Sequence, residues 1–352
     1  MAGLALNCSI AENSFFERKN YFYPDLPKGY QISQYQKPLC YQGKLTLKSG
    51  KKIDITRIHL EEDAGRLYHL PDDPDASAGA GYSLVDFNRA GVPLMELVTE
   101  PDFENGKEVK EFAEELQLIL KYAGISDADM EKGQMRVEVN ISLRNKEQEA
   151  SNKFGTKVEV KNLNSIKVAS DAVDYEIKRQ TEVINSGEKI RQETRGWDDA
   201  KKITVSQRLK EGSADYRYFP EPDLPPIKVE TRDKRQETRA KQVSFNLEEI
   251  RAKLPELPQQ RRERFKKYGL PDSNIEIFTV VRHLGDYYEE AASELDEAAK
   301  DYHKKYNLPA EVGAEPAERH MSMKLHSLAA NNIFTDFPPL LNMATTKELD
   351  DI

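Results

Sequence analysis

Two stretches in the middle of the chain alternate strictly between apolar and polar residues. The first runs from Met135 to Leu143, and the second runs from Lys157 to Lys161. A period of two places successive side chains on opposite faces of a β-strand, so each stretch predicts a half-buried strand. The polar faces would carry Arg136, Glu138, Asn140, Ser142, Lys157, Glu159 and Lys161. Such a face is either solvated or a surface on which carboxylates hold a metal and cations hold phosphates.

Helical periodicity lies on either side of these strands. Apolar residues recur every three or four positions between Val109 and Ala123, and again between Ile166 and Ile184. Asn105 can cap the start of the first helix. The segments from Tyr30 to Leu67 and from Lys189 to Lys210 have strand-like patterns instead. The chain therefore predicts an α+β fold, in which a β-rich domain has helices packed on one face and leaves the other face free for a ligand.

Several prolines near residue 225 interrupt this pattern and indicate a domain boundary. We place the first domain at residues 1–240 and the second at residues 241–352. Charged, Ala-rich stretches with helical spacing make the second an all-α helical domain. Its predicted helices are Glu248 to Lys253, Pro258 to Tyr268, Ile275 to Lys305 and Pro316 to Asn331.

The charge of the chain is unevenly distributed. Its net charge is −9, which by itself disfavours a nucleic-acid partner because phosphate binding relies on Lys and Arg. Residues 228–268 nevertheless contain 13 Lys or Arg against 7 Asp or Glu, a local balance of +6 (13 − 7). This basic segment is either a solvated helical face or a surface that follows an RNA backbone.

Composition and missing motifs exclude several classes of protein. No apolar run approaches the roughly 18 residues that a membrane helix needs, so we expect a cytoplasmic protein without membrane contact. The two cysteines, Cys8 and Cys40, rule out a disulfide framework. The sequence has neither of the common glycine-rich phosphate-binding motifs, and its six histidines show no metal-binding spacing. Any ATP site must therefore rest on another scaffold.

Two glutamates occupy positions where the surrounding pattern calls for apolar residues. Glu62 continues the inward-facing row of a predicted strand, and Glu96 lies within an apolar run. An ionised carboxylate in such a place is costly unless a cation compensates it. Each is therefore either paired with an arginine such as Arg57 or Arg89, or a metal ligand. Taken with the polar strand faces, they predict a Mg²⁺ cluster of Glu62, Glu96, Glu138 and Glu159.

The stretch from Arg18 to Gln34 is long and specific, and it resembles the hallmark of the B subunit of the aspartyl/glutamyl-tRNA amidotransferase family. Further stretches resemble the family in the same order: His59 to Gly65, Ser83 to Asp86, Asn88 to Gly91, Ser126 to Asp127, Phe154 to Ser165, Gln192 to Arg195 and Asp215 to Asp223. The resemblance covers nearly the whole chain and is strongest over residues 4–227.

This resemblance implies a protein that acts on misacylated tRNA. The B subunit of the family binds ATP and Mg²⁺ in a cradle-shaped domain and phosphorylates the side-chain carboxylate of Glu-tRNA(Gln) or Asp-tRNA(Asn). Ammonia that the glutaminase (A) subunit makes then attacks the acyl phosphate, and a small (C) subunit joins the other two into a heterotrimer. Such chemistry depends on positioning, metal and cations more than on covalent groups of the protein.

The resemblance also implies roles for individual residues. Glu62, Glu96, Glu138 and Glu159 would be metal ligands, although the family more often has Asp at position 138. Lys19, Arg136 and Lys161 would be the catalytic and ATP-binding cations that meet phosphates, and Asn140 would donate a hydrogen bond.

The chain departs from the family pattern at both ends. It begins after a Gly-Leu-Glu-Val-His segment that belongs to the family's metal site, and it stops before the family's C-terminal tail domain. The chain is therefore expected to be a fragment, a truncated gene product or a divergent member of the family, and we expect it to be inactive on its own. Two alternatives stay open, a non-catalytic tRNA-binding scaffold and the archaeal glutamyl-tRNA-specific relative, although the sequence has no room for that relative's inserted domain. The sequence does not decide between Glu-tRNA and Asp-tRNA.

Overall fold

The computed structural model describes residues 1–69, 83–144, 154–209, 216–230, 243–305, 326–331 and 333. Helices and strands both occur in these ranges, which confirms the mixed α+β class. The chain divides into two compact units, Met1–Leu254 and Pro255–Ile352. The division thus falls later in the chain than the predicted boundary at residue 240.

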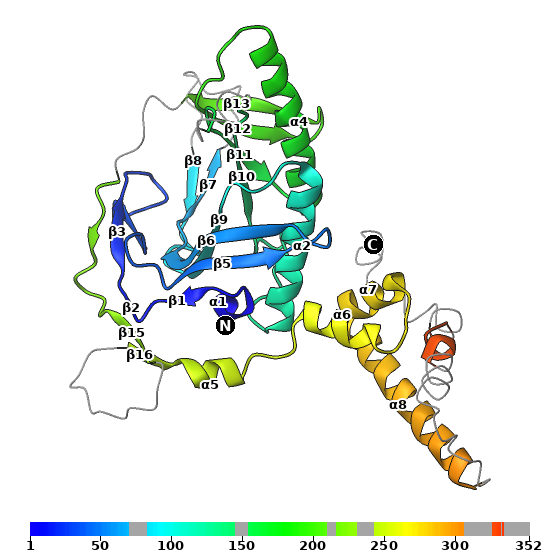
Figure 1. Cartoon of the computed structure of the whole chain (residues 1–352). Helices are drawn as coiled ribbons and strands as arrows, with labels where there is room; N and C mark the ends of the chain where they lie inside the picture. Colours follow the sequence, from blue (N-terminus) through cyan, green and yellow to red (C-terminus); the bar gives the residue numbers. More distant parts are fainter. Residues whose placement is uncertain are drawn as a thin grey trace. The chain divides into compact units, whose positions relative to one another are not determined.

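Four antiparallel strands form the first sheet of unit 1, in the order β1-β5-β6-β9 (Figure 1). Their bounds are β1 (Ser9–Ile10), β5 (Cys40–Thr46), β6 (Lys52–Glu62) and β9 (Pro93–Thr99). His59 pairs with Glu96, and Glu61 pairs with Leu94. Because directly opposed residues share a face and neighbours alternate, His59, Glu61 and Glu96 lie on one face and Glu62 lies on the other.

The second sheet of unit 1 has the order β10-β11-β12-β13. Its strands are β10 (Val137–Ile141), β11 (Val158–Leu163), β12 (Glu193–Asp198) and β13 (Ile203–Leu209). Strands β11 and β12 are parallel, so helix α4 (Ile166–Asn185) provides the crossover between them. Ala169 and Ala172 of α4 pack against Val160 and Trp197 of the sheet in one buried core.

Helix α2 (Gly106–Tyr122) packs against α4, and Figure 1 shows both helices along the same side of the two sheets. The side chain of Asn105 accepts a hydrogen bond from the backbone N–H of Glu108 at 3.0 Å, as a helix cap does. Both helices predicted from apolar spacing are thus confirmed. So are the two strands predicted from alternation, now β10 and β11.

Small sheets and short helices complete unit 1. One sheet has the order β14-β3-β4, with β14 (Phe219–Pro220), β3 (Glu17–Asn20) and β4 (Tyr30–Ser33). Another has the order β16-β15-β2, with β16 (Val243–Asn246), β15 (Ile227–Glu230) and β2 (Asn13–Ser14), and β7 (Arg66–His69) pairs with β8 (Ser83–Asp86). The short helices are α1 (Ala2–Ala5) and α5 (Leu247–Ala252). The first small sheet matters most here, because it places the chain near residue 20 beside the chain near residue 220.

The described part of unit 2 contains α6 (Pro258–Lys266), α7 (Asp272–Val280) and α8 (Arg282–Lys305). The helix predicted from Ile275 to Lys305 is two helices, because Val281 adopts a ψ of 77° and leaves the helical conformation. Phe265, Phe278 and Tyr288 form its aromatic core. Most of the predicted helix from Pro316 to Asn331 lies outside the described residues, so the all-α character of this unit stays a prediction. No helix in the described ranges has the length and apolar character needed to cross a membrane.

Candidate active site

Three potential metal ligands meet on one face of the β6–β9 pair. His59, Glu61 and Glu96 each offer one ligand atom, and these atoms all lie within 4.8 Å of one another. His59 Nε2 is 3.8 Å from Glu61 Oε2 and 3.6 Å from Glu96 Oε2. The strand register explains the grouping, because residues 59 and 61 alternate on one face and residue 96 is directly opposite residue 59. We call these three residues the acid cluster.

Among the described residues, the acid cluster has no lysine or arginine in direct contact, and none forms an ion pair with Glu61 or Glu96. Partial burial and the neighbouring Glu61 raise the pKa of Glu96 above its ordinary value, although His59, Lys19 and Arg57 act in the opposite direction. A raised pKa means that the surroundings disfavour the ionised carboxylate. Two carboxylates and one imidazole nitrogen in such surroundings are a donor set that fits a divalent cation.

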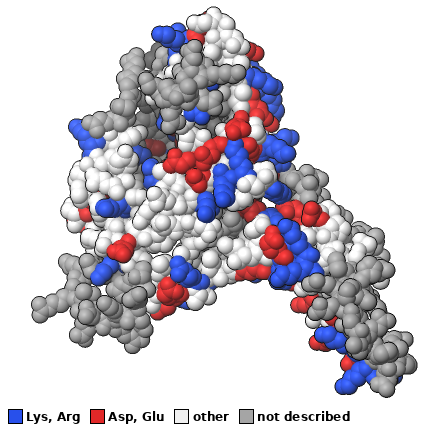
Figure 2. All heavy atoms as spheres, viewed as in Figure 1, with Lys and Arg blue, Asp and Glu red and all other residues white. Residues whose placement is uncertain are grey.

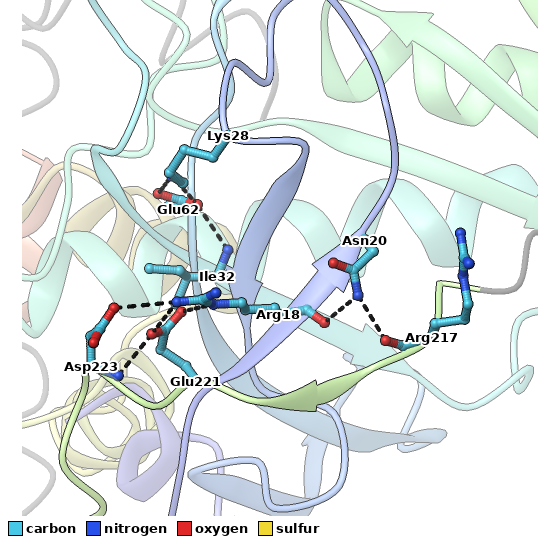
Figure 3. A network of polar contacts seen from close by, with 8 residues as sticks. All are labelled: Arg18, Asn20, Lys28, Ile32, Glu62, Arg217, Glu221 and Asp223. Carbon is cyan, nitrogen blue, oxygen red and sulfur yellow. Dashed lines mark hydrogen bonds and ion pairs between the residues drawn. The ribbon is translucent and has the colours of Figure 1, made fainter.

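Glu62 lies on the opposite face, where its side chain is held by an ion pair and hydrogen bonds (Figure 3). Lys28 Nζ lies 2.6 Å and 2.7 Å from its two carboxylate oxygens, and the backbone N–H of Ile32 donates to Oε1 at 2.8 Å. The side-chain amide of Gln31 donates to the backbone carbonyl of Glu62 at 2.7 Å. Glu62 therefore already has a cation, and its contacts tie residues 28–32 to the end of β6.

The predicted polar face of β10 and β11 forms a separate group on the second sheet. Lys161 Nζ lies 3.2 Å from Glu138 Oε1 and 3.6 Å from Glu159 Oε1, and Thr194 donates to Glu159 Oε2 at 2.9 Å. Asn140 is exposed and lies opposite Glu159. This group contains its own cation and lies on a different sheet from Glu96. The single four-acid cluster that we predicted therefore does not form among the described residues.

The other two predicted cations occupy different surroundings. Arg136 Nη2 lies 3.2 Å from Oδ2 of the buried Asp63, and Arg89 Nη2 reaches the same oxygen at 2.9 Å. Lys19 Nζ lies over the ring of Tyr216, 4.8 Å from its centroid. The charge of Lys19 opposes the rise in the pKa of Glu96, so Lys19 is a predicted cation whose charge acts on the acid cluster.

The basic segment at residues 228–268 is largely neutralised where the structure describes it. Arg261 pairs with Asp286 at 2.7 Å, Arg262 with Glu276 at 2.8 Å, and Arg264 with Glu256 at 2.7 Å. Residues 231–242 lie outside the described ranges. Figure 2 shows acidic and basic side chains interleaved on the visible face, rather than separated into fields of one sign. The arginines of α6 thus serve contacts within unit 2.

Comparison with known proteins identifies the family to which the first unit belongs. Residues 1–234 match the family model of the GatB/GatE catalytic domain. The chain belongs to this family. It is 50% identical over 297 residues to the B subunit of the aspartyl/glutamyl-tRNA(Asn/Gln) amidotransferase of Thermosynechococcus vestitus, a match that covers 82% of this chain and 56% of that protein. It is 51% identical over 294 residues to the protein of the same name from Caldicellulosiruptor saccharolyticus, with the same coverage of both chains.

Two features of the GatB/GatE match bear on the site. The chain spans about half the length of the curated relatives it matches. The acid cluster and every site residue predicted from the sequence lie within the matched residues 1–234. The predicted resemblance to the B subunit is therefore confirmed, while the roles of the individual residues stay predictions.

His59 and Glu61 are the two members of the acid cluster that the sequence did not identify in this GatB/GatE domain. Glu62 was selected instead, because that residue extends the apolar row of its strand. The pattern that could have identified the site is the polar face of the same strand, where His59 and Glu61 are two residues apart and therefore share a face. Pairing with Glu96 completes the group, and that pairing depends on a register between strands that local periodicity does not supply.

Proposed function

We propose that this chain carries the activating site of a tRNA-dependent amidotransferase. At this site, the side-chain carboxylate of Glu-tRNA(Gln) or Asp-tRNA(Asn) is activated with ATP so that ammonia can convert it to an amide. The observation that carries the proposal is the acid cluster, which lies inside a GatB/GatE catalytic domain and has no contacting lysine or arginine among the described residues. The names of the relatives specify an aspartyl/glutamyl-tRNA(Asn/Gln) amidotransferase. The reaction is that of a ligase that forms a carbon–nitrogen bond.

Each element of the site has a physical task in this proposal. His59, Glu61 and Glu96 would hold Mg²⁺, and the bound Mg²⁺ and ATP would supply charge neutralisation and a transferable phosphoryl group. The β6–β9 register holds the three ligands on one face, and the contacts of Glu62 on the opposite face hold the end of β6 in place. Lys19 and Arg57 stand close enough to change the pKa of Glu96, so they would also attract the anionic groups of a substrate.

Partner proteins follow from the same proposal. Amidation needs ammonia, which a glutaminase (A) subunit would supply, and a small (C) subunit would join that glutaminase to this chain. The relatives are themselves named as one subunit of an amidotransferase, which supports an assembly of several chains. A non-catalytic tRNA-binding scaffold is the competing function, and it needs no metal at the acid cluster.

Binding of a non-hydrolysable ATP analogue to the full chain, measured with and without Mg²⁺, tests the proposal. We expect Glu96→Gln to weaken the Mg²⁺-dependent binding by at least about tenfold, because a charged ligand is lost. Glu138→Gln is the matched control, since its side chain is 50% exposed against 45% for Glu96 but touches Lys161. Unchanged binding by Glu96→Gln would overturn the proposed site. A folded wild-type chain that binds RNA but no nucleotide would favour the scaffold.

A further inference from the structure

Strand β6 extends beyond the end of its neighbour β5. The pairing of β5 with β6 ends where Cys40 lies opposite Ile58, whereas β9 stays paired with β6 as far as Glu62. Along residues 59–62, which include two members of the acid cluster, β5 therefore no longer covers the edge of β6 that faces away from β9. An uncovered strand edge leaves backbone N–H and C=O groups without ladder partners.

Two glutamine side chains from the β4 region take up this edge. The backbone N–H of Leu60 donates to Gln34 Oε1 at 3.0 Å, and Gln31 Nε2 donates to the backbone carbonyl of Glu62 at 2.7 Å. Residues 60 and 62 have the same parity along the strand, so both direct their backbone groups to this edge. The end of β6 is thus held on this side by side chains instead of a backbone ladder.

Gln34 is fixed at both ends of its amide group. It is 1% exposed, and its Nε2 donates to Ser14 Oγ at 2.9 Å. Ser14 is equally buried and donates its hydroxyl proton to the backbone carbonyl of Lys37 at 2.6 Å. A backbone N–H can only donate, and the single proton of Ser14 is already used. The amide of Gln34 therefore has one orientation, with its oxygen toward Leu60 and its nitrogen toward Ser14.

The contact with Gln34 lies at the centre of the β6 part of the acid cluster. Leu60 is the residue between His59 and Glu61, and Glu96 lies opposite on β9. A displacement of the backbone at Leu60 would move both neighbouring side chains relative to Glu96. The affinity of a metal site depends on the spacing of its ligands and on the groups that hold those ligands in place.

We propose that Gln34 is a positioning residue for the acid cluster, which fixes the backbone of β6 at Leu60 and so keeps His59 and Glu61 at the spacing that a divalent cation needs. This inference rests on the proposed function, in which the acid cluster holds the metal. The amide of Gln34 contacts Leu60 and Ser14, so Gln34 acts through the strand and not by touching the ion.

The affinity of the full chain for Mn²⁺, measured by electron paramagnetic resonance, tests the inference. Gln34→Met keeps a side chain of similar length and removes both hydrogen-bonding groups. We expect it to weaken Mn²⁺ binding by about tenfold or more, the effect of losing a group that holds metal ligands in place. Ser14→Ala keeps Gln34 but removes the acceptor of its Nε2, and should cause a smaller loss.

Gln180→Met is the matched control for a purely structural effect. Gln180 is 0% exposed, and its amide donates to Glu176 at 2.9 Å within α4, which packs on the second sheet. Its substitution should lower the free energy of unfolding and leave Mn²⁺ affinity unchanged. Urea denaturation shows whether the two glutamine variants are folded and how much stability each has lost.

A measurement without metal examines the spacing itself. His59 Nε2 lies 3.6 Å from Glu96 Oε2, so the nuclear Overhauser effect between the His59 ring and the Glu96 side chain reports the geometry of the metal-free cluster. We expect this effect to weaken in Gln34→Met and to stay unchanged in Gln180→Met.

The outcomes separate this inference from the proposed function. Wild-type Mn²⁺ affinity in Gln34→Met would overturn the inference, as would an equal loss of affinity in Gln180→Met. If Gln34→Met did not fold, unchanged affinity in Ser14→Ala would overturn it instead. A wild type that binds no Mn²⁺ would overturn the proposed function. In that case the metal-free measurement decides the inference, which an unchanged His59–Glu96 effect in Gln34→Met would overturn.

Discussion

Glu61 and Glu62 are neighbours in the chain, yet they lie on opposite faces of β6 and in opposite electrostatic situations. Glu62 is buried, and its two oxygens contact Lys28 and the backbone N–H of Ile32. Glu61 faces His59 and a second acid, Glu96. The buried carboxylate is thus the one that the fold has already neutralised. Contact with a cation, rather than burial, distinguishes a structural acid here from one that can bind a ligand.

The same distinction applies elsewhere in the molecule. The acids of β10 and β11 contact Lys161, and the arginines of α6 contact carboxylates of unit 2. Lys19 and Arg57 lie instead on tyrosine rings and have no carboxylate in ion-pair contact within the described ranges. The acids Glu61 and Glu96 and the cations Lys19 and Arg57 therefore act on one another at a distance around the same stretch of β6 and β9.

The largest effect should come from exchanging the two neighbouring glutamates for glutamine one at a time. Glu61→Gln should weaken binding of Mg²⁺ or Mn²⁺ by more than about a hundredfold, because a charged ligand is lost. Glu62→Gln should leave metal affinity unchanged and lower the free energy of unfolding by about 2 kcal/mol, because Lys28 loses its charged acceptor. Calorimetry and urea denaturation measure the two quantities. Equal loss of metal affinity in both variants would contradict the distinction between Glu61 as a ligand and Glu62 as a structural acid.

Local patterns predicted the elements of the fold better than the contacts between them. Alternation identified β10 and β11, and three-and-four spacing identified α2 and α4, because each element buries one face. The same alternation put Glu62 on the apolar side of its strand. It did not reveal Lys28, which is 34 residues away in sequence.

The ring contacts among Tyr21, Tyr35, Tyr216 and Tyr218 could not be predicted from the sequence for the same reason. Asn20, which lies beside these rings, contacts Tyr216 across 196 residues. Contacts at such separations depend on the order and register of strands, and no local period encodes them. The motif resemblance had drawn attention to residues 18–34 and 215–223, parts of which pair as β3 and β14.

A smaller effect concerns the dependence of stability on pH. The folded protein holds the proton of Glu96 to a higher pH than the unfolded chain does, because the pKa of Glu96 is raised. Stability from this group is therefore present at low pH and falls as the pH rises from about 4.3 through the raised pKa. Glu96→Gln should remove this fall, and its melting temperature at neutral pH should equal or exceed that of the wild type. A melting temperature several degrees lower would contradict this expectation.

Glu176 provides the control of opposite sign. It is fully buried, and although burial opposes the change, hydrogen bonds from Arg179, Thr204 and Gln180 lower its pKa. Its contribution to stability is thus present above the ordinary glutamate pKa and is lost as the pH falls through the lowered value. Melting temperatures measured across the acidic range should show Glu176→Gln losing stability at neutral pH, where Glu96→Gln does not.

The smallest effect on stability should come from Lys161→Gln. This substitution also tests whether contact with a cation is what keeps a group of acids from binding a metal. Lys161 is 41% exposed, and such ion pairs contribute about 0.2 to 1 kcal/mol, so the free energy of unfolding should barely change. The substitution removes the Lys161 charge from Glu138 and Glu159, while Glu159 keeps its hydrogen bond from Thr194. One additional weak Mn²⁺ site, with a Kd of about 1 mM, should then appear in a titration followed by electron paramagnetic resonance. Adding Glu138→Gln should remove it. Loss of the original site, with no new one, would instead mean that Lys161 serves the acid cluster and that the two groups are not separate.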